Sequence, residues 1–366
     1  MDFAILAIPS LIVVFIMKYK YDKAITLKEL LVHFIAVLVA AGLSLSLTYM
    51  ALYSKLGDVE ILNGEVTQKY KHTEWCNSQS SSCKHYTLRE KCTYGTDSKG
   101  KKTKSCTTYK DFDYPYENDW IVKSTVGSSE IKRVNRQGTQ TPPRWAQIQI
   151  GEPASAEHSY HNYLFADEYS LFAARNFEEG YPEEYRKGIP DYPRVYDYYR
   201  SPHVVNSTKH STAGYEEYLG NVLKKLGPDK QLNIVVVLYD YKDALFTDAL
   251  LSKWRGGKKN DVIMMFGLDS TGNIQNFRST SFAQGMKNEE LHASLRVNAL
   301  TEKMDLTMVQ SQVKIISDKF NRLPNKEFEY MKYKMEPKKE IVVFISIILM
   351  VLSIVVGIYM KENDVL

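Results

Sequence analysis

Long apolar stretches lie near both ends of the chain, and a much longer, mostly polar region separates them. Residues Leu30–Tyr53 and Ile341–Met360 each contain about the 20 apolar residues that a helix needs to cross a bilayer. The stretch Phe3–Met17 is shorter and contains Pro9, so a tilted span, an interfacial segment and a targeting signal are alternatives. Because no basic segment precedes it and no A-x-A-like site follows it, we expect a third, retained transmembrane helix.

Lysines near these stretches predict how the helices are oriented. The short loop between the first two stretches is basic, and the positive-inside rule places such a loop in the cytoplasm. A basic cluster before the last stretch argues against this orientation, but it carries less weight because a long domain precedes it. We therefore expect an integral protein of a bacterial inner membrane, with residues 54–340 in the periplasm or outside and a cytoplasmic C-terminal tail. The loop contains Lys18, Lys20, Lys23 and Lys28, and the cluster contains Lys332, Lys334, Lys338 and Lys339.

Within the polar region, the spacing of apolar positions changes along the chain. Residues 54–151 alternate in places, as in "EILNGEVTQKY" and "DWIVKSTVG", which predicts a small β-rich subdomain with turns at Asn63-Gly64 and Gly127. Residues 152–228 are rich in tyrosine and proline, and we expect them to pack as a layer on the neighbouring domain; a recognition surface is the alternative.

The region 229–324 has the most regular pattern. The runs "LNIVVVLYD" and "DVIMMFGLD" are typical of strands covered on both faces, and "NIQNFRSTSF" predicts a third strand. Helical spacing occurs in "DALFTDALLSKW", "NEELHASLRVNAL" and "LTMVQSQVKIISDKF", giving the order β-α-β-β-α-α. The whole chain is thus expected to be a membrane-anchored α+β protein. Its segments are 1–53 (two helices), 54–151 (β-rich subdomain), 152–228 (connecting layer), 229–324 (α/β domain), 325–340 (linker) and 341–366 (last helix and tail).

All four cysteines lie in one polar stretch just after the second apolar segment. An even number of cysteines on the side expected to be oxidising predicts two disulfides in the β-rich subdomain, with the pairing left open. A zinc site is the alternative, although the spacings lack the paired C-x2-4-C knuckles of tetrahedral sites. The segment "CTYGTDSKGKKTKSC" has almost nothing apolar to bury, so we expect a solvent-exposed arm tied at its base by sulfur. The cysteines are Cys76, Cys83, Cys92 and Cys106.

The balance of charge excludes one class of partner. The net charge is +4 and 25% of the residues are charged. Basic residues are matched along the chain by acidic ones and form no long stripe, so we expect no nucleic-acid partner.

The third region resembles a known family, the TPM domain. The resemblance rests on "IVVVLYD", on the helix ending in Lys253-Trp254, on the loop Gly257–Asp261 and on "VIMMFGLDSTGNIQNF". It implies a membrane-anchored domain facing a non-cytosolic compartment, with divalent-metal phosphatase chemistry. The family's acidic-Asn-Gly order is replaced here by Asn260-Asp261 with no following glycine. Upstream, "NRQGTQTPPRWAQIQIGEPASAEHSYHNY" resembles membrane proteins of unassigned role from tailed phages and bacteria.

The loop "WRGGKKND" contains glycines and lysines, which raises the question of phosphate binding. A phosphate loop lies between a strand and a following helix, whereas Gly256 and Gly257 follow a helix and precede a strand. We therefore expect these glycines to end the helix. The sequence also contains no G-x-S-x-G or H-E-x-x-H motif.

Four aspartates at or near predicted strand ends are the remaining candidates for chemistry. Carboxylates at such positions could hold Ca²⁺ or Mg²⁺, but they are equally expected as helix caps and turn formers. Asp243 in particular resembles an N-cap. We expect no obligatory cofactor and a non-catalytic protein that binds or modulates an envelope protein; a second copy of the chain is another possible partner. The alternative is a divalent-metal-dependent phosphatase of the TPM kind. The aspartates are Asp240, Asp243, Asp261 and Asp269.

Overall fold

The computed structural model describes residues 2–77, 79, 81–96, 100–166, 175–282, 285–300 and 303–363. The chain divides into two compact units. The helical unit comprises Met1–Asp58, Ser159–Asn176 and Pro324–Leu366, and the sheet unit comprises Val59–His158 and Phe177–Leu323.

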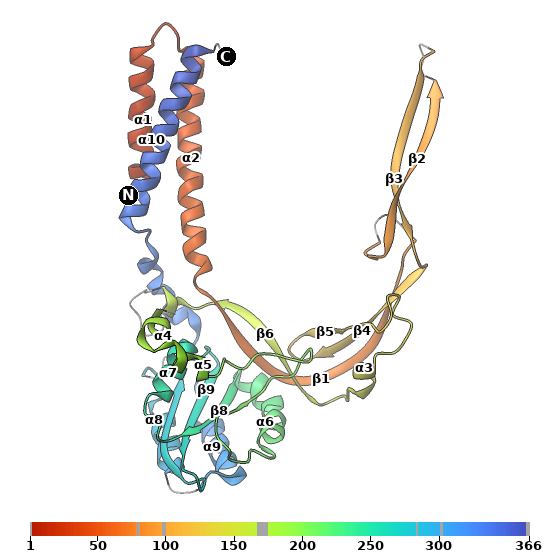
Figure 1. Ribbon diagram of the computed structural model, residues 1–366, viewed down its shortest axis with the longest axis vertical. Coiled ribbons are helices and arrows are strands. Elements are labelled where there is room, and N and C mark those ends of the chain that lie inside the picture. The colour runs from red at the N-terminus through yellow and green to blue at the C-terminus, as the bar shows by residue number, and fades with distance from the viewer. Residues whose placement is uncertain are drawn as a thin grey trace. The chain divides into compact units, whose positions relative to one another are not determined.

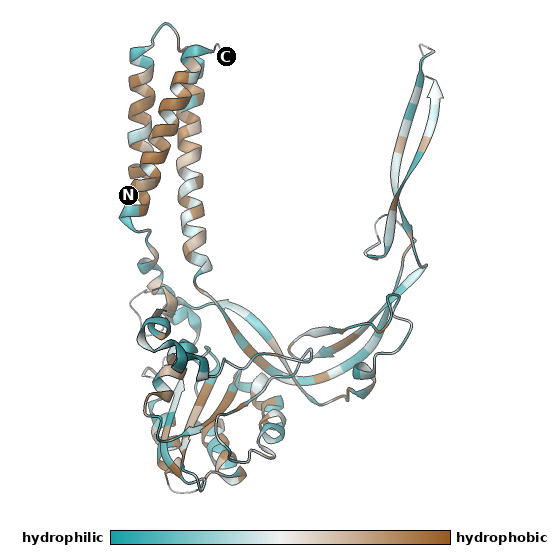
Figure 2. Cartoon of the chain, viewed as in Figure 1, coloured by the Kyte–Doolittle hydropathy of each residue, from teal (hydrophilic) through white to brown (hydrophobic). Residues whose placement is uncertain are grey.

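Three helices dominate the helical unit: α1 (Asp2–Lys20), α2 (Leu27–Ser54) and α10 (Lys339–Glu362). Each is long and apolar enough to cross a membrane, and they are the most hydrophobic helices in Figure 2. The first apolar stretch does form a helix, as expected, and α1 continues through Pro9. Where the helices meet they bury Leu6, Ala41 and Val342, while most of their other apolar side chains stay exposed. An apolar outer surface of this kind is suited to lipid.

Helix α2 begins before the apolar stretch because a polar pair caps it. Thr26 Oγ1 accepts a hydrogen bond from the Glu29 backbone N–H at 3.2 Å, and Glu29 Oε2 accepts one from the Thr26 N–H at 2.7 Å. This reciprocal capping box satisfies two N–H groups that have no partner within the helix. The unit also contains the short 3₁₀ segments η1 (Tyr163–Phe165) and η2 (Asn325–Met335).

The first sheet of the sheet unit has the strand order β5-β4-β1-β6 (Figure 1). Gly127 turns the chain between β4 and β5, as expected, and its carbonyl accepts from the Ser124 N–H at 2.8 Å. The prediction of a turn at Asn63-Gly64 is wrong, because both residues lie inside the long strand β1. A Cβ on Gly64 would lie 1.9 Å from Thr125 Oγ1, so this glycine permits a close approach between segments. The bounds are β1 Gly57–Trp75, β4 Tyr116–Ser124, β5 Ser128–Ile131 and β6 Pro153–His161, with the short helix α3 at Pro143–Gln147.

Strands β2 (Tyr86–Thr96) and β3 (Lys102–Phe112) pair only with each other, as an antiparallel two-stranded ribbon (Figure 1). We call this ribbon the arm. In its register Tyr86 lies opposite Phe112, and Cys92 lies opposite Cys106. Nearly every side chain of the arm is exposed, which confirms the expected solvent-exposed hairpin.

The second sheet has the order β10-β9-β8-β7, in which β7, β8 and β9 are parallel and β10 is antiparallel to β9. The predicted order β-α-β-β-α-α is confirmed. All eight residues of β9, and all but the last of β8, are buried, as expected for strands covered on both faces. The elements are β7 Val204–Asn206, α6 Tyr215–Lys230, β8 Asn233–Asp240, α7 Phe246–Lys253, β9 Asp261–Leu268, β10 Ile274–Ser281, α8 Glu289–Ala299 and α9 Leu306–Lys319.

Two separate cores cover the faces of this sheet. On one face, helices α6, α8 and α9 pack against alternate residues such as Val236 and Leu238. On the other face, α7 and the tyrosine-rich segment pack against Val235 and Val237. Only the middle of the expected layer 152–228 packs on this face, through α4 (Arg175–Gly180) and α5 (Glu183–Gly188). The rest belongs elsewhere, because β6 lies in the first sheet, β7 lies in the second sheet and α6 covers the opposite face.

Candidate functional site

The loop after α7 ends that helix, as its glycines predicted. Gly256 and Gly257 have φ angles of 80° and 88°, and the Gly256 N–H donates to the Leu251 carbonyl at 2.8 Å. Left-handed residues with such a bond back into the helix are a common helix C-terminus. A Cβ on Gly257 would lie 2.7 Å from Ile263 Cδ1, so a larger residue would be both strained and crowded.

Lys259 and Asn260 of this loop contact β1 and do not form a phosphate-binding loop. Lys259 Nζ lies 2.9 Å from the buried carboxylate of Glu60, which Arg322 also approaches at 3.2 Å. Asn260 Nδ2 donates to the Ile61 carbonyl at 2.6 Å. The loop thus joins the amino-terminal ends of the parallel strands β8 and β9 to the first half of β1.

Asp261 is fully buried at the start of β9, and neighbouring polar groups occupy both of its oxygens. Oδ2 accepts the Lys258 N–H at 2.7 Å, Oδ1 accepts Asn233 Nδ2 at 2.8 Å, and the Tyr192 hydroxyl lies 2.9 Å from each oxygen. Removal from water outweighs these donors and raises the pKa of Asp261 to about 6. Because its oxygens are engaged and buried, Asp261 organises the loop and is not placed to bind an external ion.

Asp240 and Asp269 do come together, at the carboxyl ends of the parallel strands. They line a cleft of about 720 Å³ with Ser207, His210 and Lys242. Asp240 is exposed, whereas Asp269 accepts hydrogen bonds from Thr271 and Asn273 that hold its pKa well below the usual range. This edge of an α/β sheet is where ligands generally bind.

The four predicted aspartates do not form one metal site. Asp261 begins β9 and Asp269 follows its end, so the eight-residue strand separates them by roughly 25 Å. The N-cap expected at Asp243 is also wrong, since α7 begins at Phe246 after Leu245. Asp243 Oδ1 instead accepts the Leu245 N–H at 3.2 Å and the Tyr185 hydroxyl at 2.7 Å. Tyr185 lies far from Asp243 in the sequence, so strand-end position alone could not reveal this partner.

The four cysteines form two disulfides, which confirms the expected number and supplies the pairing. Cys76 is joined to Cys83, and Cys92 is joined to Cys106 across the arm. The first pair lies just beyond the end of β1 and is buried; the second lies in the exposed ribbon.

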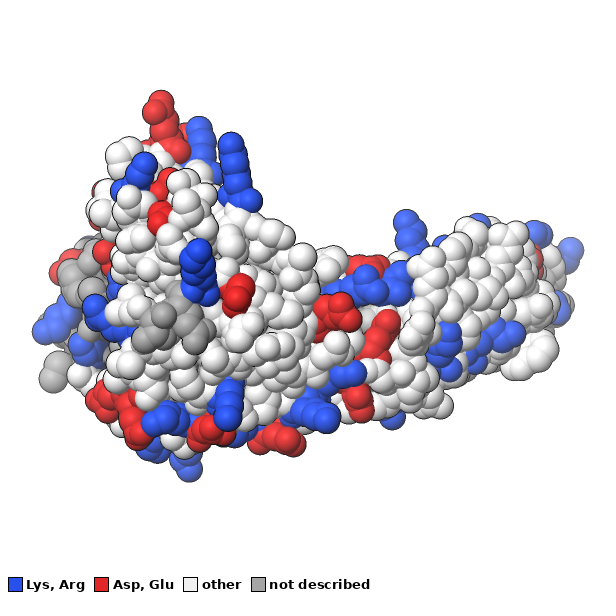
Figure 3. Space-filling model, turned by 90° about the horizontal axis from the view of Figure 1, so that it is seen from below, with Lys and Arg blue, Asp and Glu red and all other residues white. Residues whose placement is uncertain are grey.

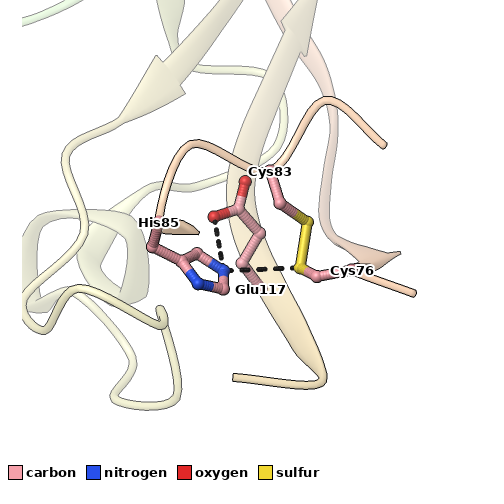
Figure 4. A group of neighbouring side chains, drawn as sticks. All are labelled: Cys76, Cys83, His85 and Glu117. Carbon is pink, nitrogen blue, oxygen red and sulfur yellow. Dashed lines mark hydrogen bonds and ion pairs between the residues drawn. A yellow bond between two sulfur atoms is a disulfide. The ribbon is translucent and has the colours of Figure 1, made fainter. Parts of the chain in front are cut away.

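A histidine and a glutamate lie against the first disulfide (Figure 4). His85 Nε2 is 3.3 Å from Cys76 Sγ and 3.2 Å from Glu117 Oε2. Arg133 Nη1 donates to the same glutamate oxygen at 3.0 Å. We call the four side chains drawn in Figure 4 the Cys76 group, and all four are buried: Cys76, Cys83, His85 and Glu117.

The backbone positions this group from three segments. The Cys76 N–H donates to the Pro115 carbonyl at 2.9 Å, and the Asp113 N–H donates to the His85 carbonyl at 3.1 Å. Sequence reasoning did not find His85 or Glu117. The C-x-H spacing from Cys83 to His85 was the one local signal, and Glu117 lies too far along the chain to be linked to it by spacing.

Comparisons with models of known protein families, with curated protein sequences and with solved structures find no match. The resemblance to the TPM domain therefore stays a prediction from the sequence.

Proposed function

We propose that this chain is a membrane-anchored binding protein whose sheet unit lies outside the cytoplasm and contacts a partner in a bacterial envelope. Three apolar helices supply the anchor, and their exposed apolar surfaces favour lipid contact. Two disulfides favour an oxidising compartment for the sheet unit. The basic loop between the first two helices favours a cytoplasmic position for that loop, which would put the sheet unit on the other side of the membrane.

The binding function is inferred from the arm, an ordered ribbon whose side chains are almost all exposed. A two-stranded ribbon alone is marginally stable in water, and this one buries almost no side chain of its own. It nevertheless exposes Leu88 and Tyr94, whose exposed fractions are 64% and 77%. The Cys92–Cys106 disulfide keeps this exposed ribbon ordered before any partner binds. Less conformational entropy is then lost on binding, which suits an element that contacts another molecule.

The charge of the arm indicates what kind of surface it fits. Basic residues outnumber acidic ones between Tyr86 and Phe112. Figure 3 shows acidic and basic side chains interspersed over much of the face that it draws. An acidic patch on an envelope protein would be complementary, whereas the arm of a second copy would be repelled.

Photo-crosslinking in native membranes tests the arm directly. A photoreactive amino acid at Tyr94 is expected to give a discrete adduct that weakens in Lys102→Glu/Lys104→Glu, because charge reversal opposes an acidic partner. The same amino acid at the exposed Lys225 is the control and should give no such adduct. Absence of a discrete adduct from Tyr94, with the protein folded and inserted, would contradict the proposal.

Thiol labelling tests the orientation separately. A membrane-impermeant reagent added outside the cytoplasm is expected to modify Lys225→Cys but not Asn363→Cys. The opposite pattern would place the sheet unit in the cytoplasm.

A metal-dependent phosphatase is the second candidate, because Asp240 and Asp269 line one cleft with His210. The full chain in detergent is assayed with a generic phosphomonoester, with and without Ca²⁺, Mg²⁺ or Mn²⁺. The binding proposal predicts no metal-dependent turnover. Turnover that disappears in Asp240→Asn and Asp269→Asn, but persists in Asp318→Asn on the exposed side of α9, would establish the enzyme instead.

A further inference from the structure

We propose that the Cys76 group is a zinc site gated by the redox state of its two cysteines. In the oxidised protein the sulfurs are bonded to each other and cannot act as thiolate ligands. After reduction, the group offers two thiolates, one imidazole and one carboxylate. Zinc is bound by these donor types in four-coordinate sites, and thiolate with imidazole favours it over Ca²⁺ or Mg²⁺.

The spacing of the ligand atoms fits a tetrahedral ion. Bonds of about 2.0–2.3 Å to a central zinc place neighbouring donors roughly 3.3–3.8 Å apart. His85 Nε2 already lies 3.3 Å from Cys76 Sγ and 3.2 Å from Glu117 Oε2. All four ligand atoms lie within 4.8 Å of one another. The main change required is separation of the two sulfurs, which breaking their bond allows.

The surroundings of the group favour a bound ion. The exposed fractions of His85 and Glu117 are 2% and 6%, so a metal there would be shielded from water. Arg133 would remain beside Glu117 and orient its carboxylate, as outer partners of metal ligands commonly do. Among the described residues, His85 Nδ1 has no hydrogen-bond partner, so it is available to carry the imidazole proton when Nε2 binds metal.

The second disulfide lacks these features and provides an internal comparison. Among the described residues, Glu90 is the one further ligand that groups with Cys92 and Cys106, and the three side chains lie largely in solvent. With no histidine and no fourth donor among the described residues nearby, this pair is not expected to hold zinc tightly after reduction.

The chemistry balances with a tertiary phosphine as reductant. The phosphine and one water become a phosphine oxide, the Cys76–Cys83 bond breaks, and two thiols form. Zinc binding then displaces the two thiol protons into solvent as two Zn–S bonds form, while the imidazole proton moves from Nε2 to Nδ1. A protein dithiol could deliver the same two electrons in a cell and would itself become a disulfide.

The segment between β1 and the arm is closed into a loop in both redox states. The disulfide joins Cys76 to Cys83 in the oxidised protein, and the zinc ion would join them in the reduced protein. The ion would in addition link this loop to β4 through Glu117. The proposal does not depend on the partner of the arm.

The test uses the full chain in detergent with Cys92→Ser/Cys106→Ser, so that reduction frees only the Cys76–Cys83 pair. After phosphine treatment and dialysis against zinc, metal analysis is expected to find one zinc per chain, and none in the oxidised protein. Cobalt(II) in place of zinc should give the visible bands of a tetrahedral site with thiolate charge transfer. Equal zinc in both redox states, or no metal in reduced protein that circular dichroism shows to be folded, would overturn the proposal.

Ligand variants sharpen the result. His85→Ala and Glu117→Gln are each expected to weaken zinc binding at least ~100-fold, beyond the effect typical of losing an outer partner. His158→Ala, at a half-exposed histidine of the same unit, is the control and should bind zinc normally. Unchanged affinity in both ligand variants would also overturn the proposal. If they fail to fold, the comparison of oxidised and reduced protein still decides.

Discussion

The second sheet and the arm both consist of paired strands, but their stability has different sources. Strand β9 is buried at every residue, whereas β2 has one partly buried residue and no buried one. The second sheet is therefore stabilised by apolar surface removed from water on both faces. The arm has almost no such surface, and its disulfide restricts the unfolded ribbon instead. A strand in this protein can thus be ordered by burial or by a covalent link, and each source predicts its own response to change.

A pair of matched leucine substitutions should separate the two regions most strongly. Leu238→Ala removes a fully buried side chain from β8 and is expected to lower the free energy of unfolding of the sheet unit by about 2–5 kcal/mol. Leu88→Ala, in the exposed arm, should change it by less than about 0.5 kcal/mol. Urea unfolding followed by near-ultraviolet circular dichroism measures both. Similar losses in the two variants would mean that the arm is buried against something in solution.

Acid should weaken the second sheet without opening the arm. Burial lowers the pKa of His203, just before β7, to about 4. The unfolded chain therefore binds a proton from about pH 6.5 downwards that the folded state does not, so stability falls as the pH drops through 6.5 to 4. This group contributes a loss of about 3 kcal/mol over that range. Urea midpoints at pH 7 and pH 4.5 should differ less in His203→Asn; an undiminished difference would assign the acid sensitivity to other groups.

Removing the disulfide of the arm should have the smallest effect on the sheet unit. Cys92→Ser/Cys106→Ser is expected to leave its urea midpoint within error, because few contacts link the arm to either core. The ribbon itself should lose about 3 kcal/mol, the value typical of a closed loop of this length. Trypsin should then cut at the lysines of the arm much faster than in Thr107→Ser, as mass spectrometry would show. Equal cutting rates would mean that the strands stay paired without the bond.

Local patterns in the sequence predicted those elements whose environment is uniform along the chain. The runs that became β8 and β9 are apolar throughout because both of their faces are covered, and the three apolar stretches are helices. The errors occurred where a distant residue decides. Gly64 packs against Thr125, so the turn assigned from local chemistry does not hold. Asp261 is bonded to Tyr192 and Asn233, two partners that local chemistry did not indicate.

The candidate sites show the same limit. The cysteines were identifiable because their number and compartment imply bonding, yet four cysteines allow three pairings. His85 and Glu117 meet only because the arm begins and ends beside the same sheet, bringing together the two segments that flank it. Their spacing in the sequence does not predict that His85 and Glu117 are in contact.

The bond from Asn260 to the Ile61 carbonyl joins residues 199 positions apart, and this has a consequence for the order of events during synthesis. At about 5–20 residues per second, a ribosome takes roughly 10–40 seconds to make the intervening chain. The first half of β1 must wait that long for its contacts with the second sheet, while the second half meets β4 much sooner. A chaperone that shields nascent strands would therefore be expected to act on residues near Ile61, before the α/β core exists to receive them.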